Sequence, residues 1–150
     1  MATRVFSEFA RANAAGEIDL NDAAVRIRIR LCMTNTTVGT DADSGITRNS
    51  NFTTIDEHGT AGQKELANKA VNRDAANGRA EFDADDVTYT ALAAGLRDVR
   101  GVLVFYDPDG LDNDANNIPI AFLEYTTDKS PDGSDFTVKF DPEGILQLAI

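Results

Sequence analysis

The sequence predicts a mainly β fold, either an antiparallel β-sandwich or a jelly-roll-like barrel of about seven or eight strands. From residue 66 onward, short apolar segments and turn residues alternate at intervals of about 8 to 12 residues, which is typical of such folds. Helical spacing occurs at the N-terminus alone, and the connections are too short for the helical crossovers that join parallel strands. At 150 residues, the chain is expected to form one domain over positions 1–150.

The clearest strand is the segment from Val25 to Leu31, whose side chains alternate between apolar and cationic. Alternation with a period of two is typical of a half-buried strand, so the apolar residues share one face of a sheet. Arg26, Arg28 and Arg30, called the arginine row below, share the other face at a spacing of about 7 Å. Because like charges repel more strongly away from water, the row needs water or carboxylates beside it.

Two interpretations of the arginine row are compatible with the sequence. The row is either a solvated face paired with carboxylates of neighbouring strands, for example Asp135 or Glu124, or a recognition stripe for an acidic surface. That surface can belong to a neighbouring copy, since the chain carries 25 acidic and 14 basic residues.

Residues 2–15 are predicted to form one short amphipathic helix. Val5, Phe9 and Ala12 recur at helical spacing, and Gly16 follows where a C-terminal cap is expected. We expect this helix to lie across an edge or an open end of the sheet.

Residues 34–64 form a long irregular segment in which Thr, Asn, Asp, Gly and Ser dominate. Connections longer than about 15 residues are uncommon in compact domains and are usually functional or mobile. We therefore expect either a loose surface loop or an arm that becomes ordered against a neighbouring subunit. In the second case, Phe52 and Ile55 are the expected contact residues.

The second half of the chain contains the remaining predicted strands. They cover residues 66–72, 79–82, 85–92, 99–106, 118–125, 136–140 and 145–150. Asn77-Gly78 is a strong hairpin signal between the first two of them. The segment 99–106 is almost entirely apolar and is expected to be a central strand covered on both faces. The apolar C-terminus is expected to pair as a strand or to dock on a partner, with Ile150 as a contact residue.

The composition excludes several classes of protein. A net charge of −11 argues against nucleic-acid binding, because neutralisation of phosphates supplies most of that affinity. No apolar run reaches the roughly 20 residues that span a bilayer, and the N-terminus lacks the apolar core of a secretory signal, so we expect no membrane partner. The single cysteine, Cys32, excludes an intramolecular disulfide, fits a reducing cytoplasm and is expected to be buried as a small hydrophobe.

Residues 107–114, called the acidic loop below, combine four carboxylates with one glycine. The carboxylates belong to Asp107, Asp109, Asp112 and Asp114. Calcium prefers such oxygen ligands, so the loop is a candidate calcium site. The EF-hand pattern does not fit, because Gly110 at the sixth loop position places Phe105 at the first. A solvated acidic hairpin without any cofactor is therefore the favoured interpretation.

The sequence contains no recognisable catalytic motif. His58 is the only histidine and has no cysteine pair to complete a zinc site, so we expect it on a surface loop. The cluster of Asp83, Asp85 and Asp86 would need a cleft and one raised pKa for acid–base work, and charges that protect a sheet edge are the simpler explanation. A phosphate-binding glycine loop and a nucleophile motif are also missing, and we predict that the protein is not an enzyme.

Three segments are distinctive in their order: F-D-A-D-D-V-T-Y at 82–89, V-L-V-F-Y at 102–106 and G-I-L-Q-L at 144–148. With them, the chain resembles small virion structural proteins of tailed bacteriophages over residues 2–30 and 79–150. The resemblance implies a non-enzymatic capsid decoration or cement protein, which binds the major capsid protein on the outside of the mature shell and stabilises it.

The resemblance further implies a virion protein that is assembled in the host bacterial cytoplasm and that associates with itself, most simply as a trimer at local three-fold positions of the shell. Two other roles stay open. One is a tail or head-tail component that forms a ring. The other is a surface or glycan-binding module that uses residues 34–64, for which the lack of tryptophan is unfavourable.

Overall fold

The structure is a computed structural model that describes residues 1–149, and it is mainly β with antiparallel strands, as the sequence predicts. Within these residues there are ten strands, one α-helix and two 3-10 turns. They are β1 (Ala2–Val5), α1 (Ser7–Ala14), β2 (Ile27–Met33), η1 (Asp43–Gly45), η2 (Asn49–Asn51), β3 (Lys64–Glu65), β4 (Ala70–Asp74), β5 (Arg79–Asp83), β6 (Val87–Tyr89), β7 (Val99–Tyr106), β8 (Ile118–Lys129), β9 (Phe136–Val138) and β10 (Leu146–Ala149).

The larger layer is an open five-stranded sheet with the order β1-β8-β7-β2-β3. β7 lies between β8 and β2 and is buried on both faces, as its apolar sequence predicts. Val102 and Val104 belong to the core on one face, and Leu103 and Phe105 belong to a second core on the other face. Because successive side chains of a strand point to opposite faces, this one apolar segment contributes to two cores.

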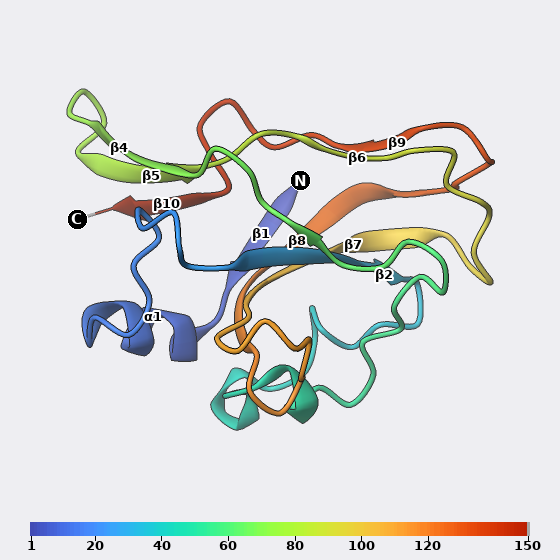
Figure 1. The fold of residues 1–150 in the computed structure, drawn as a ribbon, viewed down its shortest axis with the longest axis horizontal. Helices are drawn as coiled ribbons and strands as arrows, with labels where there is room; N and C mark the ends of the chain where they lie inside the picture. The colour runs from blue at the N-terminus through green and yellow to red at the C-terminus, as the bar shows by residue number, and fades with distance from the viewer. Residues whose placement is uncertain (150) are drawn as a thin grey trace.

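The second layer covers one face of this sheet and consists of the three-stranded sheet β10-β5-β4 and the strand pair β6-β9 (Figure 1). The predicted hairpin at Asn77-Gly78 is confirmed, since β4 pairs with β5 across this turn and Gly78 has a φ of 65°. The main core lies between the two layers and includes Ile29, Phe82 and Leu146. The strands form facing open sheets, which makes the fold a sandwich.

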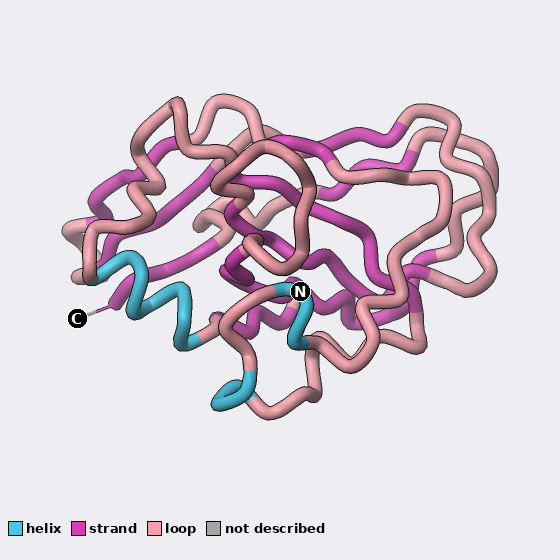
Figure 2. Tube along the Cα trace, turned by 60° about the horizontal axis from the view of Figure 1, so that its bottom comes forward, coloured by secondary structure: helices cyan, strands magenta, loops and turns pink. Residues whose placement is uncertain are grey.

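The opposite face of the large sheet is covered by residues 34–64 (Figures 1 and 2). The segment is irregular, as predicted, but it is not a loose surface loop. Val38, Ile46 and Phe52 are buried in the second core against Phe105 and Phe122 of the sheet. The backbone is held as well, for example where Thr37 N–H donates to the Thr54 carbonyl at 2.8 Å.

The prediction of a helix over residues 2–15 is wrong at its beginning. Ala2–Val5 forms the edge strand β1, which pairs antiparallel with β8, and the helix begins only at Ser7. Four residues are too few for their periodicity to distinguish an edge strand from a helical turn. The hydrogen bonds to β8 make this segment a strand. Phe9 and Ala12 are buried as predicted. β1 and the two-residue strand β3 account for the excess over the seven or eight strands expected.

The apolar C-terminus pairs as a strand, since β10 lies antiparallel to β5. The contact residue predicted at position 150, Ile150, lies outside the described residues. Among residues 1–149, no helix is long and apolar enough to cross a bilayer.

Candidate functional site

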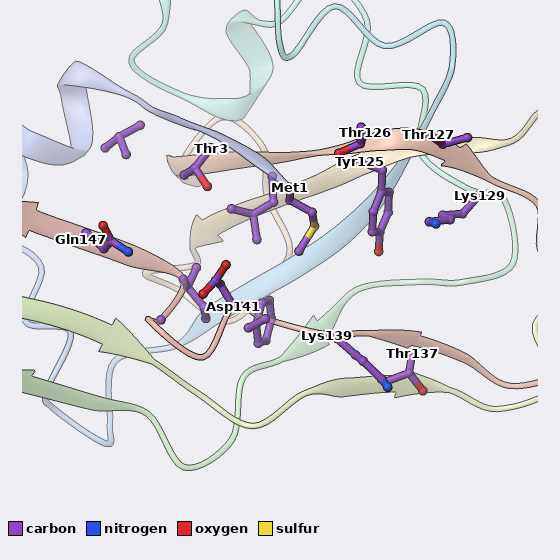
Figure 3. A pocket seen from close by; sticks show the side chains of 15 residues that line it. Met1, Thr3, Tyr125, Thr126, Thr127, Lys129, Thr137, Lys139, Asp141 and Gln147 are labelled. Atoms are coloured by element: carbon purple, nitrogen blue, oxygen red, sulfur yellow. The ribbon is translucent and has the colours of Figure 1, made fainter.

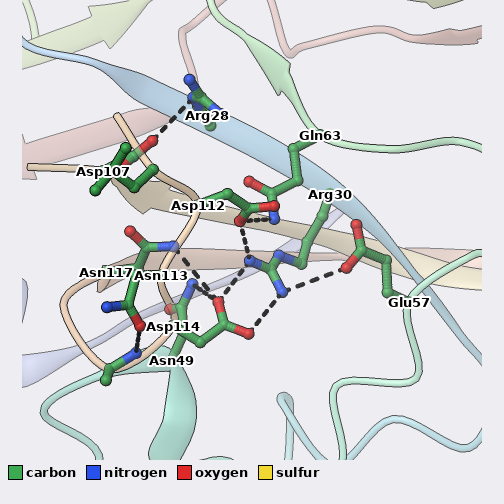
Figure 4. Close-up of polar contacts among 12 residues, drawn as sticks. Arg28, Arg30, Asn49, Glu57, Gln63, Asp107, Asp112, Asn113, Asp114 and Asn117 are labelled. Carbon is green, nitrogen blue, oxygen red and sulfur yellow. Dashed lines mark hydrogen bonds and ion pairs between the residues drawn. The ribbon is translucent and has the colours of Figure 1, made fainter. Parts of the chain in front are cut away.

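The arginine row and the acidic loop form one polar cluster (Figure 4). In β2, Ile27, Ile29 and Leu31 belong to the main core. Arg28 and Arg30 lie opposite Phe105 and Leu103 on the other face of the sheet. Arg28 and Arg30 therefore share a face as predicted, while Arg26 precedes the first residue of β2. The acidic loop connects β7 to β8 and folds over this face. The carboxylate partners of the row come from this loop and from Glu57, and not from Asp135 or Glu124.

Arg30 is the centre of the cluster, and its side chain is only 3% exposed. Its Nη1 and Nη2 donate to the two oxygens of Asp114 at 3.1 and 2.6 Å, which is a bidentate pair. The same nitrogens approach Glu57 at 3.4 Å and Asp112 at 3.5 Å. The guanidinium also stacks over the Phe105 ring, 4.7 Å from its centroid. Three carboxylates thus surround one buried cation.

Arg28 forms the second ion pair of the cluster. Its Nε lies 3.2 Å from Asp107 Oδ2, and this carboxylate is completely buried while the arginine side chain is 22% exposed. The contact is ionic without hydrogen-bond geometry, because neither atom has a hydrogen-bond partner in the described residues. The other oxygen of Asp107 accepts a hydrogen bond from Gly110 N–H at 2.9 Å. Arg28 therefore places a positive charge beside a carboxylate that is shielded from water.

Arg26 binds the backbone of the loop. Its Nε donates to the carbonyl of Asp107 at 3.3 Å, and its Nη2 donates to the carbonyl of Pro108 at 3.0 Å. Gly110 has a φ of 72°, and a Cβ at this position would lie 3.0 Å from the Arg26 guanidinium carbon. A side chain at residue 110 would meet both strain in the left-handed region and this guanidinium. The glycine therefore serves the turn and the close approach of Arg26.

The electrostatics of the cluster follow from its burial. Removal from water raises the pKa of Glu57, and the negative charges of Asp112 and Asp114 add to this effect against the opposing charge of Arg30. Asp109 differs, because the hydrogen bond from the Asn116 side chain lowers its pKa. The four loop carboxylates thus have two roles, since three pair with the arginine row and Asp109 fixes the loop itself.

The carboxylates of the acidic loop are arranged mainly as partners of arginine side chains. Asp107, Asp112 and Asp114 point to guanidinium groups, and Asp109 accepts from Leu111 N–H and from the Asn116 side chain. Within residues 1–149, no group of three His, Cys, Asp or Glu side chains is arranged to hold a metal ion. The arrangement clamps the loop to the sheet, and the solvated hairpin that the sequence favours is in part buried.

Three residues of the cluster, two of them buried, have no signal in the sequence. Asn49 and Asn117 are completely buried, and Asn49 N–H donates to the Asn117 carbonyl at 2.9 Å. Their side-chain amides both approach Asp114 Oδ1, at 3.5 and 3.4 Å. Glu57 is the third, since it reaches Arg30 from the segment 34–64. These contacts join η2 and the acidic loop, which are far apart in the sequence.

The other predicted contact residues lie elsewhere. Phe52 is 7% exposed and packs edge-to-face on Phe6, with ring centroids 5.3 Å apart, and Ile55 packs half-buried against the same core. Cys32 is completely buried as predicted, and burial raises the pKa of its thiol to about 12. The surface position expected for His58 is wrong. The residue is 2% exposed. Its ring Nε2 donates to the Ala93 carbonyl, and Nδ1 accepts from backbone N–H groups.

Comparisons with protein-family models, with curated proteins and with solved structures give no match to this chain.

Proposed function

We propose that this protein is a non-enzymatic virion component of a tailed bacteriophage, a capsid decoration protein that binds the major capsid protein on the outside of the mature shell. The observation that carries the proposal is the polar cluster around Arg30. Its cation pairs with three carboxylates, and these contacts fix two irregular segments to the sheet. Such a cluster makes a rigid body for adhesion, because its ion pairs hold two segments of the chain against the sheet.

The charge of the chain and the resemblance of its segments support the same role. An acidic protein with a net charge of −11 stays soluble at the high concentration that precedes assembly. A ligand that binds only the assembled shell stabilises that shell, by about 2.7 kcal/mol per site when its free concentration is 100 times the Kd. Trimers at local three-fold positions are the simplest closed arrangement for such binding.

The test is to mix the purified protein with undecorated shells of the same phage. Saturable binding in many copies, together with a higher melting temperature of the shells, is the expected result. One ring of copies per particle would replace this proposal by a tail or head-tail component. Failure to bind shells at all would refute the decoration role. Sedimentation of the free protein at several concentrations measures the proposed trimer directly.

A further inference from the structure

A groove of about 720 Å³ opens along one side of the sandwich (Figure 3). One wall is formed by β1 and β8 of the large sheet, and the other is formed by residues 137–147, which lie at and beyond β9. Binding sites commonly have volumes of about 300–1,000 Å³, so the groove has the size of a ligand site. It lies on the side where both layers of the sandwich end in an edge strand.

The groove has an apolar floor and a basic rim. Leu123, Phe140 and Ile145 are the buried apolar residues that line it. Lys129 and Lys139 stand on opposite walls, and Lys129 lies over the ring of Tyr125, 5.8 Å from its centroid. Asp141 is the one carboxylate among its lining residues within 1–149. In a chain whose net charge is −11, this local excess of cationic side chains favours a ligand that carries a carboxylate.

The backbone of β1 offers hydrogen-bonding groups at the mouth of the groove. Phe6 N–H donates to the Ile120 carbonyl at 3.0 Å, and antiparallel pairs alternate between hydrogen-bonded and non-bonded residues. Arg4 therefore bonds to β8, while the N–H and C=O groups of Thr3 and Val5 point away from it. No other strand of residues 1–149 pairs with β1 on that side. The side chains of Thr3 and Val5 line the groove and are exposed.

We propose that this groove binds an extended segment of another polypeptide, which adds a strand beside β1. Every second side chain of this segment faces the groove. Apolar side chains at these positions lie over Leu123 and Phe140, and a carboxylate at one of them lies between Lys129 and Lys139. Addition of a strand to an open edge supplies affinity through the backbone and specificity through alternate side chains. The inference concerns a second surface, and it goes beyond the proposed function.

Charge decides between a different polypeptide and a second copy of this chain. Two copies that met edge to edge through β1 would form a self-complementary interface. The strand that a second copy would add, Ala2–Val5, contains the cation Arg4 and no carboxylate. It therefore offers no acidic partner to Lys129 and Lys139. A carboxylate-bearing segment pairs with both lysines.

The test uses a display library of random dodecapeptides selected on the immobilised full chain. Selected peptides are expected to carry apolar residues at alternate positions, with an Asp or Glu at another position of the same face. Their affinity is then measured on Val5→Pro, which removes one outward N–H and leaves the pairing with β8 in place. Val5→Thr keeps that N–H and serves as its control. The pair Lys129→Glu and Lys139→Glu tests the rim, with Arg73→Glu on β4 as the control for charge.

The expected result is a loss of affinity of roughly tenfold or more for Val5→Pro and for the lysine reversals, with no change for Val5→Thr and Arg73→Glu. The lysine variants keep the test decisive even where Val5→Pro folds poorly. Three outcomes overturn the inference: no peptide is enriched, the enriched peptides bind all variants equally, or the groove variants only dissociate a dimer of this chain. None of these outcomes affects binding to shells, so the proposed function is judged separately.

Discussion

Replacement of Arg28 by methionine is expected to destabilise the fold more than replacement of Arg30, although Arg30 makes more contacts. Arg28→Met leaves the completely buried carboxylate of Asp107 without its counter-charge. Removal of one partner from a buried ion pair costs about 3–5 kcal/mol, and the 22% exposure of the Arg28 side chain places the expected cost near the lower end, about 3 kcal/mol. The melting temperature should then fall by roughly 6–12 °C.

Arg30→Met should cost less because water can reach its partners. The side chains of Asp114 and Asp112 are 36% and 49% exposed, so they regain hydration when the guanidinium is lost. Methionine also replaces a buried cation by an apolar group, and the expected cost is about 1–3 kcal/mol.

Equilibrium unfolding in urea measures these costs as shifts of the midpoint at constant slope. Arg100→Met is the control, because its partners Glu124 and Asp128 are 44% and 38% exposed and its loss should cost less than about 1 kcal/mol. The double variant Arg28→Met/Asp107→Asn should be destabilised by about 1–3 kcal/mol less than the sum of the two single variants. This difference is the coupling energy of the pair. The reasoning is refuted where Arg28→Met costs no more than Arg100→Met.

Three further predictions follow from individual contacts. The Arg97 guanidinium lowers the pKa of Asp56, so this pair stabilises the fold above the unfolded pKa of about 3.9 and loses its effect as the pH falls through the lower folded value. Arg97→Gln should therefore lower the urea midpoint at pH 7, and a deficit that persists undiminished well below pH 4 would contradict this. Cys32 is buried and the pKa of its thiol is raised to about 12, so alkylation followed by mass spectrometry should label it only in urea. Equal rates in native buffer would disprove the burial. Phe52→Ala should cost about 3 kcal/mol and expose residues 34–64 to thermolysin, whereas wild-type cleavage at the same rate would mean that this segment is loose.

Local patterns in the sequence predict a strand well when its burial leaves a clear pattern, either alternation for one buried face or a continuous apolar run for two. The alternation from Val25 to Leu31 predicts β2, the apolar segment 99–106 predicts β7, and Asn77-Gly78 predicts the hairpin of β4 and β5. Each of these signals depends on residues a few positions apart. The two-layer antiparallel fold therefore follows from the sequence.

Signals that depend on distant residues are missing from the sequence. β1 is four residues long and gains its hydrogen bonds from β8, more than a hundred residues later. The polar segment 34–64 gives no indication that Val38, Ile46 and Phe52 enter a second core. The face of the sheet that they cover is assembled from β2, β7 and β8.

By itself, the sequence determined the antiparallel β architecture, the buried cysteine and the division of β2 into an apolar and a cationic face. The tertiary structure alone decided what the cationic face contacts. Arg28 and Arg30 find Asp107 and Asp114 about 80 residues away in the chain, which no local pattern encodes. The physical reason is that the charges of a strand face must be neutralised by whichever segment the fold brings over them, and the fold brings the acidic loop.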